Sequence, residues 1–228
     1  MFNSAPSREH DAEARRERLL KAAATVFAKD GFEKASLRAI CLKAKANVAA
    51  VKYYFGSKEG LYREVFLSCC HPSKDKDVPV TLADGHSPEE TMRRWIHHLL
   101  DHLLLKRASN PLKSQIMAHE MREPTPCLND FIKLVVRPFH EELQRIIAGV
   151  LGRRAVDEDC IRYGHHIIGL CIHYDHCRVF IDRLGPPVPK SEAEVKCLAE
   201  NIASFVLGAL SARRASQPKP ASRSKNPS

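Results

Sequence analysis

The stretch LLKAAATVFAKDGFEKASLRAICLKAKANVAAVKYYFGSKEGLYREVF, residues 19–66, decides the fold, because its apolar residues recur at helical spacing. A first helix is predicted over residues 11–29, and Gly31 ends it by tolerating a left-handed backbone. A second short helix follows Ser36, which we expect to be its N-cap. The apolar faces of these two helices consist of Leu19, Leu20, Ala23, Val26, Phe27, Leu37, Ile40, Cys41 and Ala44.

A third short helix is predicted over residues 48–55, with Asn47 as its N-cap. Val48, Val51 and Phe55 are spaced so that we expect them to point inward. Two short helices joined by a tight turn make a helix-turn-helix, here over residues 36–55. The side chains left on the outward face are Ala49, Ala50, Lys52, Tyr53 and Tyr54.

The remaining chain reads as helix throughout, without a convincing alternating strand pattern, so the predicted fold class is all-α. Pro138 interrupts one long segment and predicts a kink near Val135, because proline lacks a backbone donor. After a fourth helix that starts at Lys58, the predicted helices span residues 88–107, 111–122, 126–151, 157–184 and 191–213. The predicted organisation is a flexible N-terminus (1–12), a helix-turn-helix domain (13–73), a second helical domain (87–212) and a disordered basic tail (213–228).

The formal net charge of +9 is unevenly distributed along the 228 residues. Residues 1–76 hold 15 Lys and Arg against 9 Asp and Glu, whereas residues 77–212 hold 16 against 18. A basic N-terminal third beside a slightly acidic remainder favours a polyanion-binding domain, although uneven surface charge alone would look the same. The tail carries five basic and no acidic residues, and either adds nonspecific DNA affinity or is inert.

Several function classes find no support in the sequence. The eight cysteines lack CxxC spacing, which argues against a disulfide framework or zinc knuckle, and we expect reduced core thiols. No secretory signal or apolar run of about 20 residues occurs, so we expect a cytoplasmic protein without a membrane partner. No nucleophile motif, phosphate-binding glycine loop or clustered carboxylate pair indicates an enzyme, and no cofactor is predicted.

Residues 19–66 resemble the DNA-binding domain of TetR-family transcriptional regulators almost position for position. The matching features are the apolar opening with its Gly-Phe end, the capped second helix, the YYF at the end of the third helix and the SKE at the start of the fourth. The resemblance implies an all-α homodimer that inserts two recognition helices into successive major grooves of a near-palindromic operator. It also implies a repressor that a small-molecule effector releases from DNA.

The resemblance and the outward face together give a set of candidate DNA contacts. Ala49 and Ala50 permit close approach to the bases. Asn47, Lys52 and Tyr53 are candidates for base edges or nearby phosphates. The resemblance assigns phosphate contacts to Ser36, Tyr54 and Lys58. Contacts with the DNA backbone are also expected from Arg38, Arg15, Arg16 and Arg18. For each of these candidate residues, the alternative is that it is a solvated surface residue or a local helix cap.

Lys45 departs from the family, which usually has glycine where the turn needs a positive φ. A lysine that keeps this conformation costs roughly 1 kcal/mol. The alternatives are an adjusted turn and a cation that also contacts phosphate.

The segments at residues 119–143 and 169–174 resemble a CecR/YbiH-type C-terminal domain, which implies a dimer interface and an effector cavity. Val195, Leu198, Ile202, Phe205 and Ala209 form a stripe that suits a dimer interface or an internal core. An amphipathic or aromatic effector is expected, and core packing is the alternative for each residue proposed to line its cavity. These residues are Trp95, His98, His102, Met117, Met121, Phe139, His173, Tyr174 and Phe180.

A metal-responsive version of the same regulator is the alternative function. His166, His173 and Cys177 lie at i, i+7 and i+11 and would share a face if residues 157–184 form one helix. Imidazole and thiolate suit zinc or copper, but no HxxxH pair is present there, and no metal site is predicted.

Overall fold

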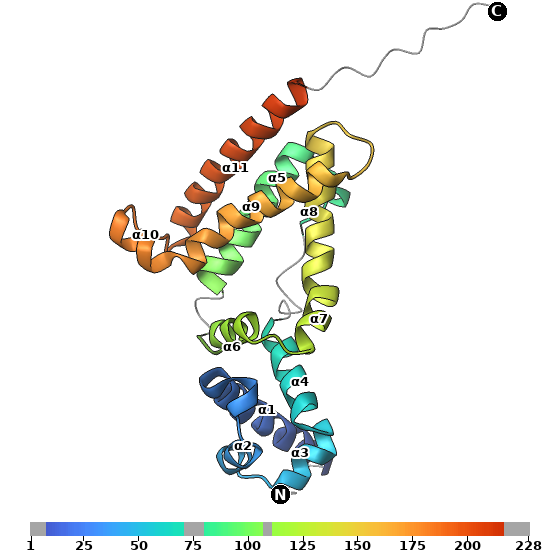
Figure 1. The fold of residues 1–228 in the computed structure, drawn as a ribbon, viewed down its shortest axis with the longest axis vertical. Coiled ribbons are helices and arrows are strands. Elements are labelled where there is room, and N and C mark those ends of the chain that lie inside the picture. The colour runs from blue at the N-terminus through green and yellow to red at the C-terminus, as the bar shows by residue number, and fades with distance from the viewer. Residues whose placement is uncertain (1–7, 71–79, 107–110, 217–228) are drawn as a thin grey trace, which may run out of the picture. The chain divides into compact units, whose positions relative to one another are not determined.

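The computed structural model describes residues 8–70, 80–106 and 111–216, and within them only helices and their connections occur. By their contacts the residues divide into two compact units. We call residues 1–78 with 106–138 the head unit, and residues 79–105 with 139–228 the body unit. This division differs from the predicted domain boundary in the segment 106–138, which packs with the N-terminal helices (Figure 1).

The head unit begins with the helices of the predicted helix-turn-helix domain, α1 (Arg8–Lys34), α2 (Leu37–Ala44), α3 (Val48–Phe55) and α4 (Lys58–Cys70). Gly31 breaks α1 with φ 72° and ψ 175°, as its predicted role requires, but a short helical turn continues to Lys34. The core of this unit is closed by α6 (Pro111–Arg122) and α7 (Cys127–Phe131), which contribute buried Ile116 and Cys127.

Two contacts tie α7 and α4 together inside the head unit. The Phe66 and Phe131 rings meet edge to face with centroids 5.5 Å apart. Nε of Arg63 donates to Oδ2 of Asp130 at 2.6 Å, and this hydrogen bond raises the pKa of Arg63. The α4 helix is therefore packed against a segment that lies more than 40 residues further along the chain.

A π-helical segment, η3 (Ile132–Val136), lies directly before Pro138. The proline nitrogen cannot donate to the carbonyl of the preceding turn, so the hydrogen-bond pattern changes there. The predicted disturbance near Val135 thus takes the form of a π-helical stretch between α7 and α8 (Arg137–Val150).

The body unit packs α5 (Pro88–Asp101), α8, α9 (Glu158–His176) and α11 (Glu192–Ala215) around one apolar core. Serine and aspartate caps start three of these helices, with hydrogen bonds from the backbone to Ser87, Asp157 and Ser191. Also described are a short 3₁₀ helix (Leu82–Asp84), a π-helical end to α5 (His102–Lys106) and α10 (Arg178–Leu184).

The prediction of a single helix over residues 157–184 was wrong. The backbone at Cys177 has φ −100° and ψ 17°, and it separates α9 from α10. Within α10 the side chains of Val179, Phe180 and Leu184 are exposed, so the apolar pattern continues past the point where the helix breaks.

The stripe on α11 belongs to two faces. Val195 and Ile202 are buried in the body core together with Ala199 and Val206, whereas Phe205 is 69% exposed and Ala209 is exposed. The helix α11 therefore has a buried apolar face and an exposed one.

Candidate DNA-binding surface

The turn between α2 and α3 keeps the left-handed conformation that the family resemblance implies. Lys45 has φ 50° and ψ 48°, and its amide and that of Ala46 donate to the last turn of α2. Lys45 is the non-glycine residue with positive φ in the described part of the chain, which costs roughly 1 kcal/mol. Its side chain is exposed next to the start of α3.

The N-terminus of α3 is fixed by Asn47, whose Oδ1 accepts a hydrogen bond from the amide of Ala50 at 2.9 Å. This confirms the predicted cap. Because the cap uses the side-chain oxygen, the amide group is the part of Asn47 that can donate to a base or phosphate.

One face of α3 packs on the core through Val51 and Phe55, both buried. Val48 was predicted to point inward, and this was wrong: its side chain is 46% exposed. Val48 is the first residue of the two-turn helix α3 and is not among its buried residues.

The opposite face of α3 is open to solvent. Ala49 and Lys52 are exposed, Ala50 and Tyr54 are half-buried, and Tyr53 is 82% exposed. The rings of Tyr53 and Tyr54 meet edge to face at 4.9 Å, so the two phenols brace each other. The small side chains near the start of α3 leave its backbone accessible to a groove.

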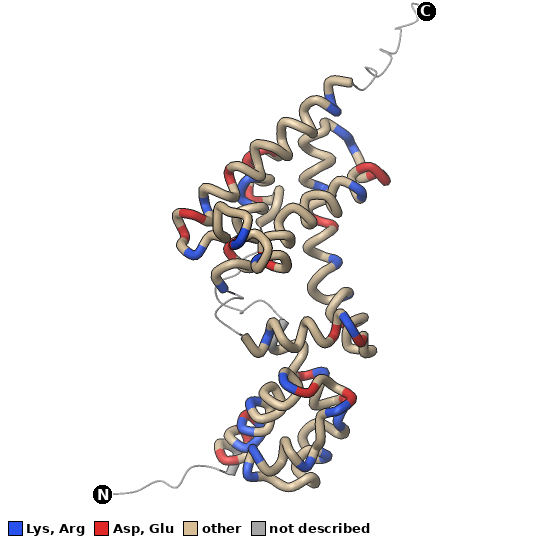
Figure 2. The backbone as a smooth tube through the Cα atoms, turned by 60° about the vertical axis from the view of Figure 1, so that its left-hand side comes forward, with Lys and Arg blue, Asp and Glu red and all other residues tan. Residues whose placement is uncertain are grey.

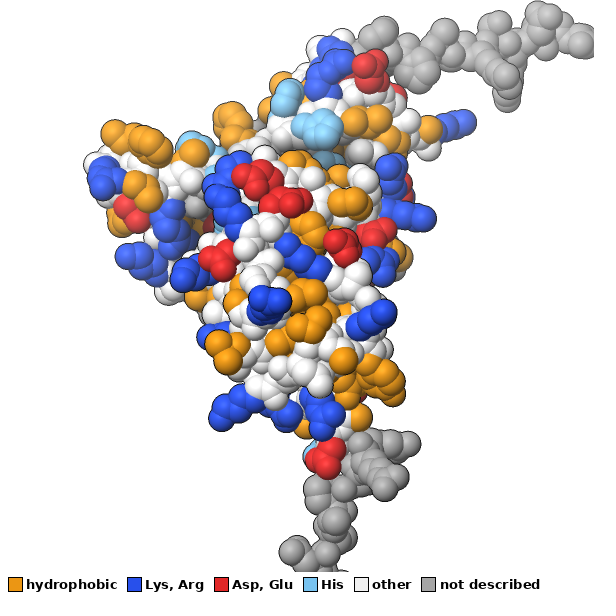
Figure 3. All heavy atoms as spheres, turned by 60° about the horizontal axis from the view of Figure 1, so that its bottom comes forward, with side chains coloured by type: hydrophobic (Ala, Val, Ile, Leu, Met, Phe, Trp, Pro, Cys, Tyr) orange, Lys and Arg blue, Asp and Glu red, His pale blue; other side chains and the backbone are white. Residues whose placement is uncertain are grey.

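Lys and Arg residues occur along each of the helices α1–α4 (Figure 2). On the face turned forward in Figure 3, Lys and Arg side chains lie among apolar ones, with Asp and Glu side chains also present. Arg38, Arg15 and Arg18 are exposed. Arg16 forms an ion pair with Glu64 and lies over the Phe55 ring at 5.6 Å, so its charge is partly used within the head unit.

Lys58 joins the start of α4 to the end of α1. Its Nζ donates to the backbone carbonyl of Glu33 at 3.0 Å and lies 4.7 Å from the centroid of the Phe32 ring. Its neighbour Glu59 has a lowered pKa, because Ser57 donates a hydrogen bond to its carboxylate.

Ser36 occupies the N-cap position of α2 with extended backbone angles, but its hydroxyl makes no capping hydrogen bond. The predicted N-cap position is confirmed, although the hydrogen bond that usually accompanies such a cap is not formed. The exposed hydroxyl can instead donate to a phosphate.

The residues predicted to line an effector cavity belong to both units. Trp95 and Phe139 stack in the body core with centroids 4.3 Å apart, and Tyr174 packs against the same core. The indole N–H of Trp95 is buried and has no hydrogen-bond partner among the described residues. His98 and His102, also in the body sequence, are half-buried.

The other predicted cavity residues lie elsewhere. Met117 packs on the head core and Met121 is 62% exposed, while Phe180 is 69% exposed and His173 is also exposed. The apolar and aromatic character of these residues did not reveal which of them are neighbours.

The metal-responsive alternative required one continuous helix to place His166, His173 and Cys177 on the same face. The helix breaks at Cys177, so this condition is not met. Among residues 8–70, 80–106 and 111–216, no group of three or more His, Cys, Asp and Glu side chains is arranged to hold a metal ion. Burial raises the pKa of Cys171, a neighbouring thiol outside the predicted set, to about 12.

A buried carboxylate in α6 had no sequence signal. Glu120 is fully buried and accepts hydrogen bonds from the Tyr62 hydroxyl at 2.6 Å and from the amide and hydroxyl of Thr125 at 2.7 and 2.8 Å. Its position in an amphipathic helix gave no reason to expect burial, since only the tertiary arrangement of α4 and α6 covers it.

Comparison with known proteins matches both parts of the chain. Residues 19–65 match the bacterial regulatory proteins of the tetR family, and residues 88–210 match the C-terminal domain of the HTH-type transcriptional dual regulator CecR. The CecR regulator of Shigella flexneri is 29% identical over 181 residues, covering 72% of this chain and 77% of that protein.

Two further proteins are similar over much of the chain. The nicotine-responsive transcriptional repressor HdnoR of Paenarthrobacter nicotinovorans is 27% identical over 142 residues, which is 61% of this chain and 71% of that protein. The crystal structure of HlyIIR, a hemolysin II transcriptional regulator, has 22% sequence identity and a TM-score of 0.57. It covers 87% of this chain and 97% of HlyIIR, and it supports the all-helical fold with an N-terminal helix-turn-helix.

Proposed function

Because the chain belongs to the TetR family of bacterial transcriptional regulators and carries a CecR-type C-terminal domain, we propose that it is a homodimeric repressor released from a near-palindromic operator by a small-molecule effector. A DNA-binding regulator of this family acts in the compartment that holds the bacterial DNA, the cytoplasm. The family and its relatives are regulators rather than enzymes.

The observation that carries the DNA-binding proposal is the exposed face of α3. Val51 and Phe55 anchor this helix, and the Asn47 cap and the left-handed Lys45 fix its start. The exposed Ala49 and Lys52 and the 82% exposed Tyr53 therefore project from a rigid support, which major-groove readout requires. Ser36, Arg38, Tyr54 and Lys58 surround them as proposed phosphate contacts.

The proposed dimer interface is the exposed apolar surface of α9 and α11. Phe205 is 69% exposed, and Ile161 and Leu170 are 41% and 37% exposed. By length and composition α11 is also apolar enough to cross a membrane, with 33% of its most apolar window buried. Since the opposite face of α11 is packed in the body core, we assign its exposed face to a second copy of this chain.

Two glycines support this assignment. Gly169 in α9 and Gly208 in α11 lie within helices and have no atom within 4 Å of where a Cβ would be. A glycine inside a helix costs about 0.5–1 kcal/mol relative to alanine, and nothing within the described chain approaches either position. A partner helix that comes close to the backbone would account for both.

The proposed effector binds among the body helices, near Trp95 and Phe139. It shifts the population toward a dimer whose recognition helices no longer match half-sites about 34 Å apart. The stacked rings and the unpartnered indole N–H favour a planar or aromatic effector with a hydrogen-bond acceptor. The nicotine response named for HdnoR is consistent with a small aromatic effector.

Selection of bound sequences from a random DNA library by the full-length protein tests the proposal. We expect an inverted repeat with half-sites about 10 base pairs apart, and a salt dependence of affinity that reports the phosphate contacts. Recovery of DNA without a common sequence would contradict an operator-specific repressor.

Variants of two proposed contacts separate their roles. Lys58→Ala should weaken binding to all sequences and lower the salt slope by about 1, whereas Tyr53→Ala should change the preferred sequence if this ring contacts bases. Lys190→Ala, an exposed lysine in the connection between α10 and α11, is the matched control and should leave both quantities unchanged. An unchanged slope for a folded Lys58→Ala protein would remove Lys58 from the phosphate contacts.

A further inference from the structure

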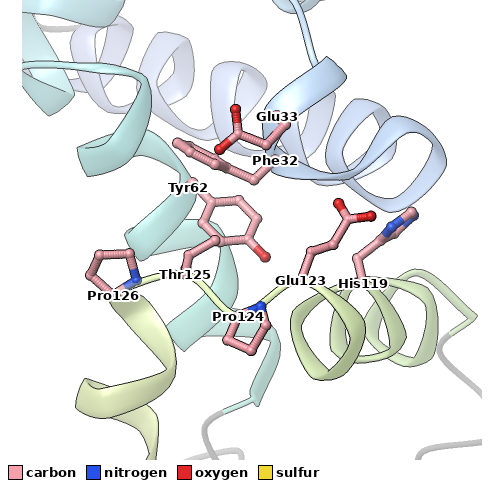
Figure 4. A pocket seen from close by; sticks show the side chains of 8 residues that line it. All are labelled: Phe32, Glu33, Tyr62, His119, Glu123, Pro124, Thr125 and Pro126. Atoms are coloured by element: carbon pink, nitrogen blue, oxygen red, sulfur yellow. The ribbon is translucent and has the colours of Figure 1, made fainter.

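A cavity of about 380 Å³ lies in the head unit, where the end of α1, the α4 helix and the α6–α7 connection meet (Figure 4). It is separate from the exposed face of α3 and from the body core. The residues that line it are Phe32, Glu33, Tyr62, His119, Glu123, Pro124, Thr125 and Pro126.

The aromatic part of the cavity wall consists of Phe32, which is half-buried, and Tyr62, which is only 1% exposed. The centroids of Phe32 and Tyr62 are 5.0 Å apart, and the ring planes are inclined by 50°. Tyr62 cannot turn its hydroxyl to a ligand freely, because that group donates to the buried Glu120 carboxylate. Pro124 and Pro126 on the α6–α7 connection add rigid apolar surface opposite these rings.

The ionisable groups at the cavity offer acceptors rather than donors. His119 is already engaged: its Nε2 lies 3.1 Å from the Ala28 carbonyl, and its Nδ1 lies 3.0 Å from the Arg122 guanidinium. Arg122 can only donate, so Nδ1 accepts and Nε2 carries the proton given to Ala28. No donor of His119 is left for a ligand.

The carboxylates of Glu33 and Glu123 flank the cavity on two sides (Figure 4). Within the described part of the chain, no ion pair involves Glu33, and Glu123 pairs with Arg122 at 3.5 Å through side chains that are both more than 60% exposed. Such an exposed pair contributes little and can exchange for another cation.

We propose that this cavity binds an organic cation, with its apolar or aromatic part against Phe32 and Tyr62 and its ammonium group between Glu33 and Glu123. Aromatic faces and carboxylates together are the groups that recognise alkylated or aryl ammonium ions. The volume suits a ligand with one ring and a short side chain.

The same cavity is coupled to Lys58. The Phe32 ring that lines it also lies under the Lys58 ammonium, and the Glu33 backbone accepts from Lys58. A bound cation would compete for the ring and repel this ammonium, moving it from its position at the start of α4. The expected effect on DNA affinity rests on the proposed function, in which Lys58 contacts a phosphate. The binding of the cation to the cavity does not depend on that contact.

Titration of the full-length protein with three probes of similar size tests the site: 2-phenylethylammonium, 2-phenylethanol and 3-phenylpropionate. Calorimetry, with Tyr62 and His119 signals followed by NMR, should show binding of the ammonium probe at least about tenfold tighter than the neutral and anionic probes. Equal binding of the three probes, or signal changes confined to the body core, would overturn the proposed site.

Substitution of the two carboxylates supplies the second test. The folded double variant Glu33→Gln, Glu123→Gln should lose the preference for the ammonium probe, whereas Glu17→Gln, an exposed carboxylate elsewhere on α1, should keep it. A preference that survives the double substitution would overturn the assignment. If the ammonium probe binds but the DNA affinity of the wild-type protein is unchanged, only the coupling to Lys58 is overturned. Operator selection without the probe tests the proposed repressor function independently.

Discussion

At the residue scale, Gly31 shows how a local backbone requirement and a tertiary contact meet at one position. Its φ of 72° lies in the left-handed region, and a Cβ built there would come within 3.0 Å of Nδ1 of His119. The His119 ring thus fits against α1 because position 31 has no side chain, and it hydrogen-bonds to the Ala28 carbonyl from that position.

We expect Gly31→Ala to lower the free energy of unfolding by about 1–3 kcal/mol, from the left-handed backbone and from displacement of His119. Urea denaturation followed by circular dichroism measures this loss. Gly56→Ala is the matched control, because Gly56 has φ 75° with nothing within 4 Å of its Cβ position. Equal losses for the two variants would mean that the His119 contact contributes nothing.

The buried Glu120 carboxylate provides a second prediction at this scale. Tyr62→Phe removes one of its three described donors and should destabilise the protein by about 1–3 kcal/mol, because a buried acceptor loses its partner. Glu120→Gln should cost less than Glu120→Leu, since the amide can accept from Thr125 and donate to the Tyr62 oxygen. Thermal unfolding of the three variants checks this order, and a loss below about 0.5 kcal/mol for Tyr62→Phe would contradict it.

Residue positions governed by the local chain were predictable, and those governed by distant neighbours were not. The Asn47 cap depends on backbone angles within a few residues, and the sequence indicated it correctly. At Lys45 the sequence left an adjusted turn open, and the structure has the left-handed conformation. The exposure of Val48 and the burial of Glu120 depend on where other helices end and pack. The contacts that the outward side chains of α3 make with DNA stay a prediction.

At the scale of elements, the helical periodicity located the helices well but did not show every break. Residues 172–180, IHYDHCRVF, contain neither proline nor glycine, so the separation of α9 from α10 had no local signal. The buried residues of α9 end at Cys171, and beyond that point the chain no longer follows the core. Pro138, in contrast, predicted a kink near Val135, and the backbone there is π-helical.

Substitution of an exposed helical glycine is predicted to affect protomer stability and dimer affinity in opposite directions. Gly208→Ala should stabilise the isolated protomer by about 0.5–1 kcal/mol through helix propensity, yet weaken the proposed dimer by obstructing close approach. Unfolding at low concentration reports the first effect, and analytical ultracentrifugation reports the second. The stability measurement is also the control for the dimer measurement. A variant protomer that is more stable than wild type must still have α11 folded. An unchanged or tighter dimer would place the interface elsewhere.

At the scale of the whole molecule, the two-part organisation was predictable but the membership of each part was not. The change in charge after residue 76 and the long polar connector marked a boundary there. Nothing in the sequence of α6 and α7 shows that Ile116 and Phe131 pack with the N-terminal helices rather than with their chain neighbours α5 and α8. The aromatic residues predicted to share one cavity were distributed between the units for the same reason.

The discontinuity of the head unit bears on how such regulators can be recombined. A chimera that transfers only residues 1–73 would separate Phe66 from Phe131, Arg63 from Asp130 and Tyr62 from Glu120. The graft would carry an uncovered aromatic cluster and three broken contacts into its new host. A functional exchange of DNA specificity must therefore move residues 111–136 along with the helix-turn-helix, or else change only the outward side chains of α3 and leave the scaffold in place.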